Sequence, residues 1–176
     1  ALNCPLLAGR DPVFIVAGFA GGLAMALIVL QPLLAAGRLP GIPTHAGRRV
    51  QRWLGALLCL TVVIHVGGLW ITSPPDVVDA LLFVSATPFS VWGVLAMWAV
   101  FATAILAIWR RRLRFRLWRA LHMVLAIVIV VGCVVHALLI DGTMQTLSKV
   151  ALSAFLLAVA APIIAPRLIG RPLRKS

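Results

Sequence analysis

Five long apolar segments are the feature of this sequence that most restricts its fold. An α-helix rises about 1.5 Å per residue, so about 20 mostly apolar residues cross the ~30 Å hydrocarbon core of a bilayer. Such segments cover residues 12–36, 50–70, 89–109, 117–140 and 147–168. Only 11% of the 176 residues are charged, whereas a soluble domain has about 25%. We therefore predict an all-α membrane protein, a five-transmembrane-helix bundle that forms a single domain over residues 1–176.

The basic residues are concentrated on one side of the predicted membrane. Of the 16 basic residues, only Arg10 and Lys149 fall on the other side, together with all four acidic residues. The positive-inside rule then predicts an outer N-terminus, a cytoplasmic C-terminus and a multi-pass protein of a bacterial inner membrane, surrounded by lipid. The net charge of +12 would suggest nucleic-acid binding in a soluble chain. Because the basic residues lie between membrane-length apolar segments, we expect no nucleic-acid partner.

The segments between the predicted spans carry turn residues, notably at positions 37–43, 73–76 and 141–143. Residues 77–85 are too few to span a bilayer and are expected to form an outer loop at the interface, with Trp70 and Trp92 as interfacial anchors. The first apolar segment is too long for a signal peptide and follows no basic region, so we expect it to be a span.

Several classes of chemistry have no residues to support them. The apolar segments contain no Ser/His/Asp set, no Gly-rich phosphate loop and no carboxylate pair, so hydrolysis and nucleotide-driven transport are excluded. Cys4, Cys59 and Cys133 form no CxxC pair and indicate neither a disulfide framework nor a zinc site.

Histidines inside the apolar segments are the candidate functional residues, because an imidazole is costly in lipid. His122 and His136 are 14 residues apart, which places them on nearly the same helix face, about 21 Å apart along the axis. His65 follows Gln51 by the same 14 residues on a span of the same direction, so His65 and His136 should face each other at one depth in the outer half of the membrane. Small residues adjoin these positions, at Gly55, Gly67, Gly68 and Gly132.

Two facing neutral imidazoles in a helix bundle are the arrangement that holds a b-type haem edge-on between helices. The alternative is that His65 and His136 bond to each other or to a backbone carbonyl, and only fix the packing of the helices.

Two sequence elements resemble the ferric-reductase-like transmembrane domain. The first reads Gln51-Arg52-Trp53-Leu54-Gly55 and is followed by His65; the second reads Trp118-Arg119-Ala120-Leu121-His122 and is followed by His136. This family includes the haem-binding membrane subunit of the periplasmic methionine-sulfoxide reductase system and the membrane cores of NADPH oxidases. Its helices carry up to two stacked haems, each bound by one histidine from either helix.

The resemblance implies that the cofactor is haem b. It implies at least one haem and leaves open whether there is a second. It implies that His65 and His136 ligate an outer haem and that His122 contributes to an inner one. Gln51 stands where the family has its other inner ligand, so an inner haem would be five-coordinate, would take a substitute ligand such as His45, or would be absent. A replaced inner ligand also occurs in the methionine-sulfoxide reductase subunit group, which makes that branch the better match.

Arg52 and Arg119 adjoin the inner ligand positions and are candidates to neutralise haem propionates. The resulting hypothesis is a transmembrane b-type cytochrome, the electron-transfer subunit of an oxidoreductase system. It would carry electrons across the bilayer from a quinol or a separate flavin reductase to a periplasmic acceptor, such as a periplasmic reductase. The sequence stops without a flavin- or nicotinamide-binding domain, so we expect no NAD(P)H oxidation by this chain alone. Two alternatives are a non-catalytic accessory subunit of a larger membrane complex and a quinone-linked cytochrome of the b561 type.

Overall fold

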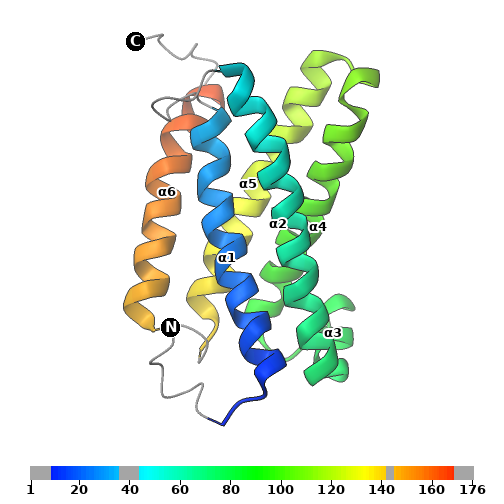
Figure 1. The fold of residues 1–176 in the computed structure, drawn as a ribbon, viewed down its shortest axis with the longest axis vertical. Helices are drawn as coiled ribbons and strands as arrows, with labels where there is room; N and C mark the ends of the chain where they lie inside the picture. The colour runs from blue at the N-terminus through cyan, green and yellow to red at the C-terminus, as the bar shows by residue number, and fades with distance from the viewer. Residues whose placement is uncertain (1–8, 36–43, 142–144, 169–176) are drawn as a thin grey trace.

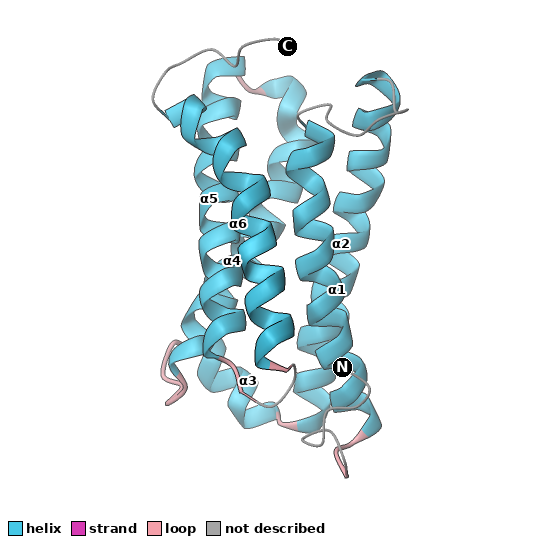
Figure 2. Cartoon of the chain, turned by 90° about the vertical axis from the view of Figure 1, so that its left-hand side faces the viewer, coloured by secondary structure: helices cyan, strands magenta, loops and turns pink. Residues whose placement is uncertain are grey.

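A computed structural model describes residues 9–35, 44–141 and 145–168. The helices are α1 (Pro12–Ala35), α2 (Thr44–Thr72), α3 (Pro74–Leu81), α4 (Pro88–Ile108), the 3₁₀ helix η2 (Trp109–Arg112), α5 (Phe115–Leu139) and α6 (Thr146–Leu168). The described residues contain no strand, and five of the helices are long and apolar enough to cross a membrane. The predicted all-α bundle of five spans is therefore confirmed (Figures 1 and 2). The predicted loop at 37–43 and most of the one at 141–143 lie outside the described residues.

The five long helices run up and down, so their connections alternate between two ends of the bundle (Figure 1). At one end, the top of Figure 1, α2 begins and η2 joins α4 to α5. We name this the arginine-rich end, after Arg49, Arg52 and the arginines between positions 110 and 119. The opposite end carries α3 and the four aspartates, Asp11, Asp76, Asp79 and Asp141.

Packing is closest within two antiparallel hairpins, α1 with α2 and α4 with α5. The last helix, α6, contacts α1 and α5 and so joins the two hairpins. By contrast, α2 and α5 have few close backbone approaches to each other, although both carry the candidate histidines. Contact between α2 and α5 therefore depends mainly on their side chains.

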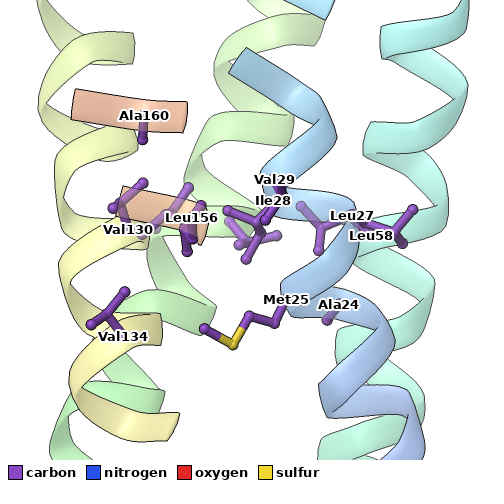
Figure 3. Packing of buried hydrophobic residues seen from close by; sticks show 13 residues of the cluster. Ala24, Met25, Leu27, Ile28, Val29, Leu58, Val130, Val134, Leu156 and Ala160 are labelled. Carbon is purple, nitrogen blue, oxygen red and sulfur yellow. The ribbon is translucent and has the colours of Figure 1, made fainter. Parts of the chain in front are cut away.

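The main apolar core lies near mid-height of the bundle and contains residues from all five long helices, most of them from α1 and α5 (Figure 3). Leu156 of α6 is fully buried there, against residues such as Ile28 of α1 and Val130 of α5. Burying a side chain of this size stabilises the packed state by about 1.5–3 kcal/mol in water; between spans in lipid, close van der Waals packing is the larger contribution. The core thus holds α1 and α5 together next to the histidines, on the side of the arginine-rich end.

The predicted span at residues 50–70 agrees with the membrane-spanning part of α2, Arg49–Thr72, whereas one local prediction, the loop after it, was wrong. Helix α2 begins at Thr44, six residues before the predicted span, because its polar first turns are helical although they are not apolar enough to count as membrane-spanning. Part of the predicted outer loop is the short helix α3, in which Pro74 and Pro75 occupy the first turn, where a missing N–H costs no hydrogen bond. Val77 of α3 is buried while the apolar residues that follow the helix, such as Leu82 and Phe83, are exposed.

Candidate functional site

The structure brings together the imidazoles of His65 on α2 and His136 on α5. Their ring centres are 6.4 Å apart and their planes are nearly perpendicular, at 82°. The two rings lie between the mid-height core and the end of the bundle opposite the arginines. The predicted proximity of these two histidines at one depth is therefore observed.

Each imidazole is held by a backbone carbonyl of the neighbouring helix in its own hairpin. The Nδ1 of His65 donates to the carbonyl oxygen of Ala17 on α1 at 2.7 Å, and the Nδ1 of His136 donates to that of Phe89 on α4 at 2.9 Å. A carbonyl oxygen can only accept, so in each neutral ring the proton lies on Nδ1. The Nε2 of each ring therefore keeps its lone pair, which is the form that binds a metal ion.

A glycine one helical turn beyond each carbonyl makes room for the ring. A Cβ at Gly21 would lie 2.9 Å from Nδ1 of His65, and a Cβ at Gly93 would lie 2.7 Å from Nδ1 of His136. Real carbon and nitrogen atoms do not approach so closely. Only glycine at these two positions lets the imidazoles lie against α1 and α4.

The two hairpins repeat this arrangement. The carbonyls of Ala17 and Phe89 are 72 residues apart in sequence, and so are Gly21 and Gly93. The histidines are 71 residues apart. We call each set of carbonyl, glycine and imidazole a seat. The candidate site thus consists of two seats, one in each hairpin, whose imidazoles meet between α2 and α5.

Four other glycines lie near the histidines in the sequence, and a Cβ at any of them would not meet an imidazole. A Cβ at Gly68 would lie 2.8 Å from Cβ of Ala17, and one at Gly132 would lie 2.9 Å from the carbonyl oxygen of Trp92. These two glycines allow close packing of helices within each hairpin. At Gly67 nothing lies within 4 Å, and at Gly55 the nearest atom is an amide nitrogen of Gln31 at 4.0 Å. Sequence reasoning missed Gly21 and Gly93, although their spacing of 72 parallels that of the histidines.

His122, which lies toward the arginine-rich end, is in a different environment. His122 stacks on the indole of Trp118, with ring centres 5.3 Å apart and an angle of 11° between planes. The guanidinium of Arg110 lies 4.7 Å from the centre of the Trp118 ring, and that of Arg119 lies 5.6 Å from the Phe115 ring. The predicted role of Arg119 toward a propionate stays a prediction.

The seat is not repeated at the inner level. On α5, His122 lies 14 residues before His136; on the antiparallel helix α4, 14 residues after Gly93 is Ala107, which has a Cβ. On α2, the position equivalent to His122 is the partly buried Gln51. Arg52, the other arginine expected near this level, is exposed. His45 lies in the first turn of α2, and its side chain is outside the described part of the structure.

The two imidazoles lie close enough together for both to be ligands of one bound group. A metal–imidazole nitrogen bond is about 2.0 Å, so two histidines that bind the same metal ion have rings only a few ångströms apart. The observed separation is 6.4 Å. The protonated Nδ1 atoms and their carbonyl partners are also the usual outer-shell arrangement of histidine ligands.

Comparison with known proteins gives one family. The family described as "ferric reductase like transmembrane component" matches residues 18–133, about two thirds of the chain. The match includes His65 and His122 and ends three residues before His136. No curated protein and no solved structure matches the chain. The extent of the family match, on a bundle of five membrane-spanning helices, shows that this chain belongs to the ferric reductase-like transmembrane components.

Proposed function

We propose that this protein is a transmembrane b-type cytochrome, the electron-transfer subunit of an oxidoreductase system. The observation that carries the proposal is the pair of imidazoles with ring centres 6.4 Å apart, each with its Nδ1 bonded to a carbonyl. Family membership supports a transmembrane electron-transfer component in general terms. The specific part of the proposal is that the cofactor is haem and that His65 and His136 would hold it.

The ligand set suits a haem better than a bare metal ion. A structural zinc site takes four protein ligands, usually Cys and His, whereas a porphyrin supplies four nitrogens and leaves two axial positions for the protein. The described residues contain no group of three or more His, Cys, Asp or Glu that could surround an ion. Haem b bound between the two seats would supply one-electron redox chemistry.

The chain's own residues perform the binding and the orientation. The carbonyls of Ala17 and Phe89 keep the proton on Nδ1 and fix the direction in which each ring presents Nε2. The surrounding apolar helices provide a site of low dielectric constant and exclude water. Because α1 and α4 hold the rings that α2 and α5 carry, four helices determine the geometry of the two ligands.

The remaining parts of the proposal concern the orientation of the protein in the membrane and its redox partners. The charge asymmetry supports an inner-membrane protein with the arginine-rich end in the cytoplasm and the paired imidazoles toward the outer face. A quinol or a separate flavin reductase would then donate electrons, and a periplasmic reductase would accept them. The substitution at Gln51 supports a place near the haem-binding membrane subunit of the methionine-sulfoxide reductase system within the family.

The test is the absorption and EPR spectrum of protein purified in detergent. Wild type should show a low-spin haem b, and the perpendicular ring planes predict a strongly anisotropic ferric EPR signal. His65→Ala and His136→Ala should each abolish the low-spin spectrum, whereas the matched control His122→Ala, on the same helix as His136, should keep it.

Three other outcomes identify the alternatives. A folded wild-type protein that binds no haem would leave the two histidines as packing residues. A haem-free protein that co-purifies with a larger complex would indicate an accessory subunit, the reading that the Gln51 substitution favours. A haem-containing protein that oxidises quinol in the absence of any partner would indicate the b561 type.

A further inference from the structure

A buried lysine on α6 contacts the turn of α5 that carries His136. The side chain of Lys149 is only 8% exposed, whereas the arginines whose side chains are described are all exposed. Its Nζ donates to the carbonyl oxygens of Leu138 at 3.1 Å and Ile140 at 2.8 Å, and to the carboxylate of Asp141 at 3.2 Å. Three acceptors for three N–H donors leave this buried ammonium fully hydrogen-bonded.

The position of these acceptors explains why a charge is tolerated there. The last carbonyls of a helix have no partner within the helix, and the C-terminus carries a partial negative charge. The carbonyls of Leu138 and Ile140 lie at the end of α5, which terminates at Leu139. The side chain of Asp141 is 96% exposed, so water screens its attraction for the ammonium group. The two backbone carbonyls are therefore the principal acceptors.

His136 belongs to the same turn. The amide of Ile140 donates to the carbonyl of His136 at 3.1 Å, and His136 lies only three residues before the end of α5. Terminal helix turns fray unless other groups hold them. His65 has no such need, since α2 continues for seven residues beyond it, to Thr72.

We propose that Lys149 is a positioning residue for His136: by binding the carbonyls at the end of α5, it fixes the backbone of the turn from which the imidazole projects. The carbonyl of Phe89 on α4 orients the imidazole of His136. Lys149 on α6, a helix that supplies no ligand, holds the backbone of the same turn. The spectroscopic part of this inference depends on the proposed haem site, whereas the backbone part does not.

The experiment compares Lys149→Met, which keeps the length of the side chain but removes its donors, with Lys149→Arg and with Asp141→Asn. In haem-free protein, amide hydrogen exchange at Ile140 should become at least about tenfold faster in Lys149→Met, because the end of α5 loses its two hydrogen bonds from Lys149. In haem-loaded protein, Lys149→Met should broaden the low-spin ferric EPR signal and accelerate haem dissociation about tenfold. Lys149→Arg should restore both properties, and Asp141→Asn should resemble wild type.

A lower melting temperature in Lys149→Met, with unchanged exchange at Ile140 and an unchanged EPR signal, would show that Lys149 only attaches α6 and would overturn the proposal. If Lys149→Met does not accumulate, Lys149→Gln, which lacks the charge but keeps two N–H donors, is measured in the same way. If wild type binds no haem, the proposed function fails, while the exchange rate at Ile140 still decides whether Lys149 holds this turn.

Discussion

Replacing either seat glycine by alanine should weaken haem binding without weakening the apoprotein. In Gly21→Ala the new Cβ would lie 2.9 Å from Nδ1 and 3.0 Å from Cε1 of His65; in Gly93→Ala it would lie 2.7 Å from Nδ1 of His136. Ordinary contacts of this kind are about 3.5 Å, so the rings must move by about 0.6 and 0.8 Å. Such a movement lengthens the Nδ1 hydrogen bond to Ala17 or Phe89 and redirects Nε2.

The cost falls on the haem-bound form. Overpacking costs about 1–3 kcal/mol when the side chain cannot move away, and a ring bonded to iron cannot. In the apoprotein the imidazole can rotate at the cost of its Nδ1 hydrogen bond, about 1 kcal/mol, and alanine in place of glycine offsets this loss because it favours the helix by up to about 1 kcal/mol. We therefore expect haem affinity to fall about 10- to 100-fold, with an unchanged or higher melting temperature of the apoprotein.

The assay is titration of the detergent-solubilised apoprotein with haemin, followed by the Soret band, together with thermal unfolding. Gly22→Ala is the matched control, since it makes the same substitution in the same helix where no atom lies within 4 Å of the added Cβ. The control should bind haem as wild type does. Wild-type affinity and spectrum in both seat variants, or an equal loss in Gly22→Ala, would refute the steric argument.

Three further predictions concern haem number and packing. His122→Ala should leave the low-spin spectrum intact, and the pyridine haemochrome assay should give about one haem per wild-type polypeptide, because the inner level lacks a second seat; a ratio near two would contradict this. Leu156→Ala should destabilise the bundle by about 2–5 kcal/mol by opening a cavity at a fully buried position, measured as a lower unfolding midpoint with an unchanged haem spectrum. Gly132→Ala should cost about 1–3 kcal/mol because its Cβ would lie 2.9 Å from the Trp92 carbonyl, whereas Gly67→Ala, in open space, should not; equal melting temperatures would count against this packing.

Hydropathy alone predicted the number and approximate limits of the spans, because the membrane-crossing part of each helix must be apolar. It could not predict where α2 begins, since the polar turns from Thr44 onward continue the helix beyond the apolar stretch. It also missed α3, because Pro74 and Pro75 are typical both of a turn and of a helical first turn, and only the following residues distinguish the two.

The spacing of the histidines predicted which two imidazoles meet, since helical periodicity fixes face and depth along each span. The same reasoning did not identify the glycines that adjoin the imidazoles. Gly68 and Gly132 lie on the histidine helices themselves and pack against α1 and α4, whereas the glycines that adjoin the rings, Gly21 and Gly93, lie on α1 and α4. Which residue of one helix lies opposite a residue of another depends on the register of the packed helices, and a single sequence does not contain that register explicitly.

The sparse backbone contact between α2 and α5 has a consequence for how the cell could regulate the amount of this protein. With haem bound between the two seats, the cofactor itself would link the α1–α2 hairpin to the α4–α5 hairpin at a level where their backbones approach little. A ligand that binds only the assembled bundle stabilises it by about 2.7 kcal/mol at a free concentration one hundred times its dissociation constant. Haem supply would then set the fraction of chains that escape proteolysis, so the abundance of this protein would follow haem availability without any change in the synthesis of the polypeptide.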